Sequence, residues 1–397
     1  MADATGMRRV DATGLRPEVS ARLEDTIARW RGLELGDDFD PRASEMVVAA
    51  GLHTVVVPEE HGGLGAGVDE AVRMLAALGA VDGSSALGFA MHVHVVGSAA
   101  ESPGWPAGLR EWLFTEVANR GALINAASTE ESGGSPARGA IPGTVADPVT
   151  DGYTLTGEKT WTTWLPALRY ALVSARVAGS DDPPRIGTFI VDLEAPGVVR
   201  RPGFEALGMR ASASGRLRLD SVTVAADRVL GIRPVGAPDP RGPAPQAWFG
   251  LSIAAVYLGV GEGARSDVAR WALDRRPGDG STAVADIPTV QVRLGRLDAT
   301  LRAARMVVLD VARRWAESPP EVRATLAPDI ALAKLVATNA AVSATDEALR
   351  IAGGPGFMSG RLERAFRDAR AGLINPPLED VAYQGFAKIV LERERAR

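Results

Sequence analysis

The stretch Gly157-Glu158-Lys159-Thr160-Trp161-Thr162-Thr163 lies near the middle of this 397-residue chain, in the region whose pattern decides the fold. Between residues 126 and 231, short β-rich runs alternate with turns that contain Gly, Pro and Asp. Strands at this spacing predict a β-barrel or a β-sandwich. The clearest runs are 153–156, 170–173, 188–191 and 217–219.

The region before residue 123 is helical in pattern. Apolar residues recur at intervals of three and four over 19–30, which predicts an amphipathic helix. The run Thr54-Val55-Val56-Val57 predicts a short extended segment, which a glycine-rich turn at 62–65 ends. Helical periodicity resumes at Asp69, and the small apolar residues over 84–99 predict a helix that is buried on most sides.

Helices are predicted again after Trp248. Apolar residues from Leu294 to Trp315 step alternately by three and four, which is typical of a helix that faces a bundle. The proline pair 319–320 separates it from a second long helix over 330–351, and a final helical region runs from Ser359 to the C-terminus. The sequence therefore predicts a multidomain α+β fold, with an N-terminal helical domain over 1–122, a central β-barrel domain over 123–235 and a C-terminal four-helix bundle domain over 236–397.

Composition excludes several classes of function. The formal net charge of −5 argues against nucleic acid or an anionic membrane as a partner, because both are bound by basic patches. The absence of cysteine excludes disulfides and thiolate nucleophiles, and only four histidines argue against a metal centre. Neither a signal peptide nor a membrane span is evident, so we expect a cytoplasmic protein. Only three of the 44 basic residues are lysines: Lys159, Lys334 and Lys388.

Several local motifs, taken in order, resemble those of the acyl-CoA dehydrogenase superfamily of flavoproteins. Residues 126–135, Ala-Ala-Ser-Thr-Glu-Glu-Ser-Gly-Gly-Ser, are similar to the family's threonine–glutamate to glycine–serine loop. Residues 157–163 resemble its Gly-x-Lys-x-Trp-x-Thr strand. Each motif alone is weak, but their order along a helix–β–helix chain is specific. The other matching segments are 51–65, 196–198, 207–210, Gly353-Gly354-x-Gly356 and 366–370.

The resemblance implies a bound FAD, or FMN or reduced flavin if the chain is a monooxygenase. It places Trp161 against the isoalloxazine ring and the Thr163 hydroxyl near N5, where hydride chemistry occurs. The pyrimidine edge of the ring would meet the Thr129 hydroxyl and the backbone of Ala127, Ser128 and Thr129. Ser135 would lie near the flavin phosphates or an acyl thioester. Read without the resemblance, Thr129 and Ser135 are turn residues and Trp161 is a barrel-core aromatic residue.

The resemblance also implies a homodimer or homotetramer and a second group of cofactor residues, of which one arginine reaches across a subunit boundary. One arginine would grip the cofactor's diphosphate, and two ways of counting select either Arg275 or Arg276. Arg350 stands where the family commonly has a glutamine that faces the adenosine portion of the cofactor. Gly353 and Gly354 would let the backbone approach the cofactor closely, although they equally suit a helix–helix turn. The family's usual Phe-Gly pair beyond the arginine is absent.

One feature of the family is missing. Dehydrogenation of an acyl thioester needs a carboxylate that removes the α-proton. Alignment from Arg367-Asp368 puts Pro376 at the position of the family's usual glutamate. Alignment on Leu258-Gly259 puts Phe249 at the position that a minority of the family uses. Neither side chain can act as a base.

Three explanations for the missing base stay open at this point. Glu379 or Asp380 acts from a reshaped loop, or an acid from elsewhere replaces the base, or the chain does not dehydrogenate acyl thioesters. The acids from elsewhere are Glu130, Glu131 and Glu262.

Superfamily monooxygenases lack the glutamate, because a partner reductase supplies their reduced flavin. In such an enzyme His92 or His94 would provide a polar group at the flavin edge, although a histidine on an apolar helix is more often a packing residue. We therefore expect an oxidoreductase that acts on an acyl thioester of CoA or a carrier protein, with an electron acceptor protein as partner. The alternatives are a flavin-dependent hydroxylase or N-oxygenase with a separate flavin reductase, and a catalytically silent scaffold subunit.

Overall fold

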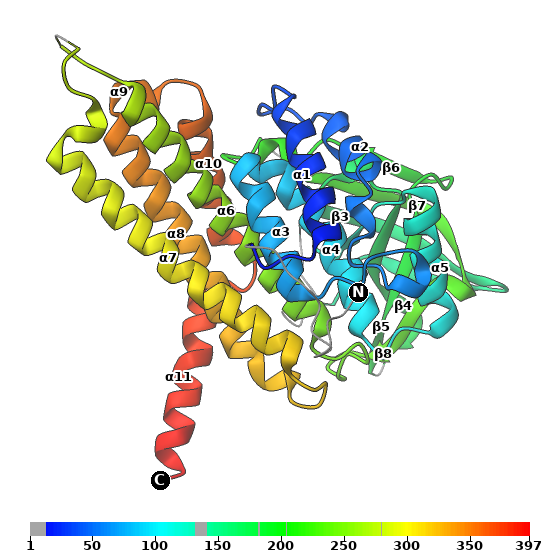
Figure 1. Ribbon diagram of the computed structural model, residues 1–397. Helices are drawn as coiled ribbons and strands as arrows, with labels where there is room; N and C mark the ends of the chain where they lie inside the picture. Colours follow the sequence, from blue (N-terminus) through cyan, green and yellow to red (C-terminus); the bar gives the residue numbers. More distant parts are fainter. Residues whose placement is uncertain (1–12, 132–140, 182, 204, 279) are drawn as a thin grey trace, which may run out of the picture.

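The computed structural model describes residues 13–131, 141–181, 183–203, 205–278 and 280–397. Helices, then strands, then helices follow one another along the chain, which confirms the predicted fold class. The N-terminal helices lie between the β-sheet on one side and a long helical bundle on the other (Figure 1).

The N-terminal part is built around α4, a helix buried over almost its whole length. The Asp82 carboxylate caps α4 by accepting a hydrogen bond from the Ser85 N–H at 2.8 Å. The helices of this part are α1 (Pro17–Arg31), α2 (Pro41–Ala49), α3 (Val68–Val81), α4 (Gly83–Glu101) and α5 (Ala107–Arg120).

The prediction of an extended segment over 54–57 is wrong. Residues Leu52–Thr54 form a short 3-10 helix, and the buried valines that follow lie in a turn. The glycine-rich segment folds back on this turn, since the Gly65 N–H donates to the Val57 C=O at 2.8 Å. A Cβ at Gly63 would lie 2.0 Å from the same carbonyl oxygen, so only glycine permits the approach.

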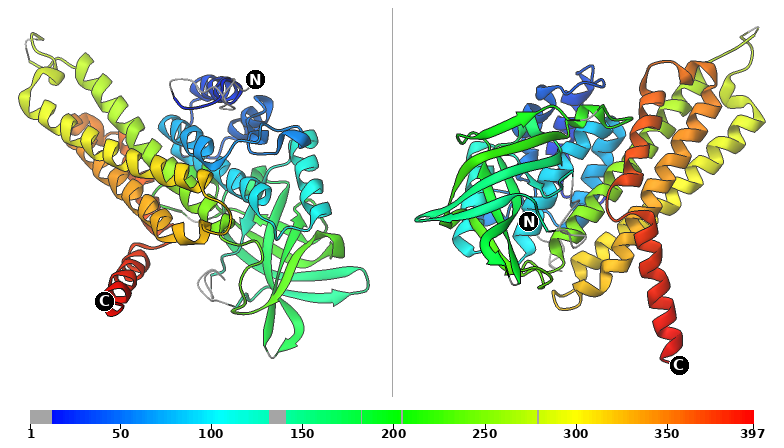
Figure 2. Two further views of the ribbon diagram at one scale, coloured as in Figure 1. Left: turned by 60° about the horizontal axis from the view of Figure 1, so that its bottom comes forward. Right: turned by 180° about the vertical axis from the view of Figure 1, so that it is seen from behind.

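The central part is one strongly curved sheet of eight strands (Figure 2). Its hydrogen-bonded order is β6-β7-β3-β2-β4-β5-β8, and β1 pairs with β4 in parallel. No pairing joins the outer strands β6 and β8 in the described part of the chain, so the predicted barrel is an open one there. The strands are β1 (Ile124–Ala127), β2 (Val145–Val149), β3 (Gly152–Thr162), β4 (Tyr170–Asp181), β5 (Pro184–Asp192), β6 (Val198–Arg201), β7 (Gly215–Ala225) and β8 (Val229–Pro234).

The C-terminal part is the predicted four-helix bundle. Its core helix α6 is long and apolar enough to cross a membrane, but 89% of its most apolar window is buried against other helices, as in the core of a soluble protein. On α7 the stripe predicted from Leu294 to Trp315 is buried from Leu297 onward, whereas Leu294 is half-buried. The bundle helices are α6 (Ala244–Asp274), α7 (Pro288–Glu317), α8 (Ala327–Ala352) and α10 (Arg361–Ile374), with the short α9 (Gly354–Phe357) at one end.

The final helical region consists of two helices. Residues 375–378 separate α10 from α11 (Glu379–Arg395), because Pro376 and Pro377 lack the N–H that a helix needs. Helix α11 leaves the bundle and runs away from the sheet (Figures 1 and 2).

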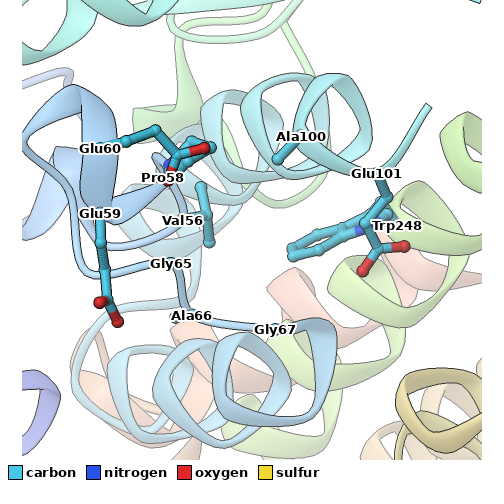
Figure 3. Close-up of a pocket in the computed structure, with 10 residues that line it drawn as sticks. All are labelled: Val56, Pro58, Glu59, Glu60, Gly65, Ala66, Gly67, Ala100, Glu101 and Trp248. Atoms are coloured by element: carbon cyan, nitrogen blue, oxygen red, sulfur yellow. The ribbon is translucent and has the colours of Figure 1, made fainter. Parts of the chain in front are cut away.

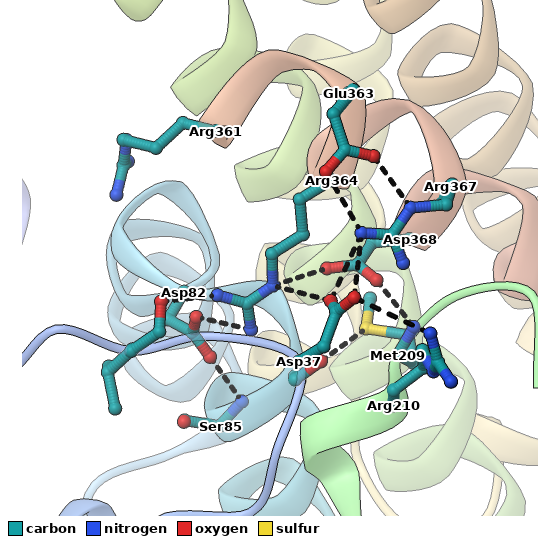
Figure 4. Close-up of polar contacts among 12 residues, drawn as sticks. Asp37, Asp82, Ser85, Met209, Arg210, Arg361, Glu363, Arg364, Arg367 and Asp368 are labelled. Carbon is teal, nitrogen blue, oxygen red and sulfur yellow. Dashed lines mark hydrogen bonds and ion pairs between the residues drawn. The ribbon is translucent and has the colours of Figure 1, made fainter. Parts of the chain in front are cut away.

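A polar network joins the three parts (Figure 4). The buried Asp368 of α10 accepts a hydrogen bond from the Met209 N–H at 2.5 Å, and Arg364 pairs with Asp82 at the start of α4 at 2.7 Å. A Cβ at Gly208 would lie 2.2 Å from the Arg367 carbonyl oxygen, so the loop after β6 rests directly on α10. The network fixes the bundle relative to both other parts.

Candidate functional site

Two segments of the central part, residues 126–129 and 160–163, lie side by side. The Thr160 N–H donates to the Thr129 C=O at 2.8 Å, just beyond the end of β1. The Asn125 amide donates to the Thr163 C=O at 3.1 Å. The structure thus gathers five predicted cofactor residues, Ala127, Ser128, Thr129, Trp161 and Thr163, whereas the sixth predicted on these loops, Ser135, lies outside the described residues.

Trp161 stands on a β-bulge. Its φ is 57°, and the register between β3 and β7 shifts between Lys159 and Thr162. Its side chain is 45% exposed, while Thr160 and Thr162 are buried. A bulge redirects a side chain in this way. The interpretation of Trp161 as a barrel-core aromatic residue is therefore wrong.

Thr163 is linked to two serines that the sequence analysis missed. Its hydroxyl lies 2.9 Å from the Ser214 hydroxyl, which lies 3.1 Å from that of Ser212. A threonine hydroxyl can accept one hydrogen bond and donate another, so Thr163 retains capacity for a ligand. The signal in the sequence was the Ala-Ser-Ala-Ser run at 211–214, directly after the matched segment 207–210.

His92 is a packing residue in this structure, contrary to its predicted catalytic role. Its Nδ1 accepts from the Ile124 N–H at 3.3 Å, so Nε2 carries the proton and donates to the His53 C=O at 2.9 Å. Burial lowers the pKa of His92 to about 3, which keeps the ring neutral. Both ring nitrogens of His92 therefore form hydrogen bonds within the protein, and neither is available to a ligand.

His94 occupies a different environment on the same helix. Its ring packs edge-on against Phe249 of α6, with ring centroids 5.4 Å apart. Burial lowers the pKa of His94 to about 4, so it too is neutral at pH 7. The histidine predicted as the alternative to His92 therefore touches the residue at one of the two expected base positions.

A cavity of about 380 Å³ lies between the end of α4, the start of α6 and the glycine-rich turn (Figure 3). Trp248 forms one wall and packs against Gly97, where a Cβ would lie 2.3 Å from the indole. Glu101 also lines the cavity, although its carboxylate already accepts hydrogen bonds from Trp315 and Arg323. Apolar residues and three glutamates form the lining, with no basic residue among them, so the carboxylates would repel a phosphate here.

The predicted catalytic acids Glu379 and Asp380 are the first two residues of α11, and Asp380 is exposed. No contact of either acid with residues 126–129 or 160–163 is recorded in the part of the chain that the structure describes. The turn before them is anchored on the bundle, since Lys334 donates to the Pro377 C=O at 3.1 Å and Asn375 to the Tyr257 hydroxyl at 2.9 Å. Burial lowers the pKa of Lys334 to about 8, and Glu379 opposes that shift.

The three acids considered as replacements are held in ion pairs. Glu130 pairs with the buried Lys159, Glu131 with Arg216 on the surface, and Glu262 with Arg305 between α6 and α7. None has the unengaged carboxylate that a base requires.

The second group of predicted cofactor residues lies at the end of the bundle that is distant from the sheet (Figure 1). Arg276 donates to the carbonyls of Leu273 and Asp274 there, and Arg350 pairs with Asp346. Gly353 has a φ of 61°, which glycine adopts readily at the end of α8. The predicted residues at this end of the bundle, away from Thr163 of the same chain, are Arg275, Arg276, Arg350, Gly353 and Gly354.

Comparison with known proteins agrees with this arrangement. Three domain families match in order: acyl-CoA dehydrogenase N-terminal domain over 13–117, middle domain over 125–222 and C-terminal domain over 251–374. The putative acyl-CoA dehydrogenase YdbM of Bacillus subtilis is 33% identical over 86% of this chain and 87% of its own length. L-evernosamine nitrososynthase of Micromonospora is 27% identical over 96% of this chain and 89% of its own.

Solved structures share the fold as well. FMN-bound TdsC, a dibenzothiophene monooxygenase from Paenibacillus sp. A11-2, superposes with a TM-score of 0.83 over 95% of this chain and 97% of its own, at 22% identity. At that identity the likeness concerns the fold alone. Taken with the matching domains and the relative in Bacillus subtilis, it confirms the resemblance drawn from the motifs. The chain belongs to the acyl-CoA dehydrogenase family.

Proposed function

We propose that this protein is a cytoplasmic flavin-dependent monooxygenase, which takes reduced flavin from a separate reductase. The observation that carries the proposal is the absence of an acid at both positions where the family holds its base, Pro376 and Phe249. The turn that contains Pro376 is anchored by Lys334 and Asn375, which argues against a swing that would bring Glu379 in. The monooxygenase TdsC has the same fold, so this fold is compatible with such a reaction.

The residues at the ends of β1 and β3 fit a flavin ring. Trp161 is 45% exposed, and an indole is suited to stacking against a flat aromatic ring, while the hydroxyls of Thr129 and Thr163 suit polar ring atoms. A bound flavin would supply the redox chemistry that the side chains lack. The protein's part is to hold and orient the ring with these side chains.

The cofactor residues at the distal end of the bundle would serve a flavin held by a second copy of this chain. Arg275 or Arg276 and Arg350 suit the diphosphate and adenosine portions of FAD, which FMN lacks. We therefore infer a homodimer or homotetramer. FMN is the alternative cofactor, favoured by the absence of the family's Phe-Gly pair at this end.

The visible spectrum of the purified protein tests the proposal. A monooxygenase binds reduced flavin and forms product only when a reductase and oxygen are present. When acyl-CoA thioesters are added without oxygen, any oxidised flavin bound to it stays oxidised. Bleaching of a resident flavin by an acyl-CoA would show a working base and overturn the proposal. Failure of the folded protein to bind any flavin would instead support a silent scaffold.

Acyl thioester dehydrogenation is the second candidate function, and the position of Glu379 beside the turn that holds Pro376 favours it. If Glu379 is the base, Glu379→Gln abolishes flavin reduction by an acyl-CoA, because an amide cannot accept the α-proton. We expect no change in oxygen-dependent turnover in this variant. Stopped-flow absorbance of flavin reduction, with Asp380→Asn as the matched control, separates the two outcomes.

Thr163→Val is expected to weaken flavin binding by about 2- to 12-fold, the equivalent of one hydrogen bond worth about 0.5–1.5 kcal/mol. The matched control is Thr162→Val, because the Thr162 hydroxyl is buried without a hydrogen-bond partner among the described residues. Removing that hydroxyl leaves binding unchanged. Titration of each variant with flavin, followed by fluorescence quenching, measures both effects. Equal affinities of the two variants would contradict the placement of Thr163 at the ring.

A further inference from the structure

An ion pair beneath the candidate flavin edge is buried and fully engaged. The Lys159 ammonium and the Glu130 carboxylate are 2.5 Å apart, with side chains 0% and 7% exposed. Glu130 also accepts from the N–H groups of Gly143 and Thr144, at 2.5 and 3.0 Å, and from the Thr144 hydroxyl at 2.7 Å. Although burial opposes the charge, hydrogen bonds from Lys159 and Thr144 lower the pKa of Glu130.

The pair connects the two segments that would hold the ring. Glu130 directly follows Thr129, and Lys159 directly precedes Thr160. The Thr160 N–H donates to the Thr129 C=O, so two adjacent links, one hydrogen bond and one ion pair, join the segments. Lys159 also reaches Ser174 of β4, at 3.4 Å, which ties both segments to the middle of the sheet.

The bulge at Trp161 begins one residue beyond this double link. A left-handed backbone is unfavourable for a bulky residue and persists only where its surroundings hold it. The strand is held on its inner side by Lys159, and the next turn is held by the Trp164 N–H, which donates to the Ser212 C=O at 2.8 Å. The orientation of Trp161 therefore depends on the position of Lys159.

Stability alone does not explain a buried pair. Taking two charges out of water costs about as much as their attraction returns, so a buried pair contributes little net stability, and a role in fixing one local structure is the hypothesis it raises. The presence of lysine at position 159 also favours a role in fixing the local structure, because the chain uses arginine for all but three of its 44 basic residues. A compact ammonium fits where a planar guanidinium would not.

We propose that Glu130 and Lys159 are positioning residues for the flavin, which hold Thr129 and Trp161 at the spacing that the ring requires. The inference rests on the proposed flavin-dependent function. It reassigns Glu130 from a candidate base to a residue that acts through its neighbours.

The test compares Glu130→Gln with Glu131→Gln. Both remove one carboxylate charge from adjacent residues, but Glu131 is exposed and its partner Arg216 lies on the surface. In Glu130→Gln we expect at least a tenfold loss of FMN and FAD affinity and a shift in the visible absorption bands of the bound flavin. Glu131→Gln is expected to stay within twofold of the wild type with unshifted bands.

A second variant keeps the test decisive if Glu130→Gln does not fold. Glu130→Gln/Lys159→Met removes both charges and leaves no unpaired ion, so it is expected to fold but still to bind flavin at least tenfold more weakly. A folded variant with wild-type affinity and bands overturns the positioning role and leaves the flavin-dependent function intact. A folded wild-type protein that binds neither FMN nor FAD overturns both.

Discussion

Trp164→Ala is expected to destabilise the protein by about 3–5 kcal/mol, the usual cost of truncating a buried tryptophan to alanine. Trp164 is fully buried and packs against α4, where a Cβ at Gly88 would lie 2.1 Å from its indole. The Phe89 ring lies 6.5 Å away, centroid to centroid. The variant removes the contact by which the segment after β3 rests on the N-terminal helices. Chemical denaturation followed by circular dichroism measures the loss.

Trp161→Ala is the matched control, because it makes the same change three residues earlier in the chain. Its indole is 45% exposed, so the truncation should change the free energy of unfolding by about 0.5 kcal/mol or less. The loss of flavin affinity should be large in Trp161→Ala and smaller in Trp164→Ala. An unchanged denaturation midpoint in Trp164→Ala would contradict the packing argument, and wild-type flavin affinity in Trp161→Ala would contradict the site.

Trp161 and Trp164 also show which features of the fold the sequence can predict. The segment 157–163 predicted a strand and a cofactor contact, and alternation along that strand would have placed residues 161 and 163 on one face. The bulge breaks the alternation, and it depends on a pairing with β7 that lies more than fifty residues further along the chain. Local sequence does not encode such a register shift.

The helical parts were the most predictable, because their patterns are long and periodic. The stripe from Leu297 to Trp315 spans five turns, and its burial follows directly from the spacing. The prediction of a strand at valines 55–57 was wrong because a short apolar run has no periodicity that would identify its structure. The contacts of Gly63 and Gly65 with this segment determine its conformation.

The candidate site was predictable only where a motif carried it. Thr129, Trp161 and Thr163 came from the resemblance, and the structure brings them together. His92 and His94 could not be distinguished by sequence, since both are histidines on one apolar helix. Their difference arises from partners on other elements: Ile124 and His53 occupy His92, whereas Phe249 faces His94.

The polar network around Asp368 predicts a pH dependence of stability that one substitution should remove. Burial raises the pKa of Asp368 to about 6 from its ordinary value of 3.8, and the nearby Arg364 only partly opposes the shift. The folded protein therefore holds a proton between pH 3.8 and 6 that the unfolded chain releases. The contribution of Asp368 to stability is largest below pH 3.8 and falls as the pH rises towards 6, by about 3 kcal/mol in all.

Asp368→Asn should abolish this dependence. The amide oxygen can still accept the hydrogen bond from Met209, but the side chain no longer titrates. The other charged groups around it, Arg364, Arg367 and Asp82, remain in place. The difference in free energy of unfolding between variant and wild type should thus shift in favour of the variant by about 2.4 kcal/mol between pH 4 and pH 7.

Denaturation midpoints at pH 4, 5.5 and 7 measure this difference. Asp37→Asn is the control, because Asp37 belongs to the same network through Arg367 but is one-third exposed. This control shows the effect of removing a carboxylate from the network at a more exposed position. A constant difference for Asp368→Asn would mean that Asp368 is ionised in the folded protein at pH 4. The arginines, and not a bound proton, would then be what allows a carboxyl group to lie between the three parts of the fold.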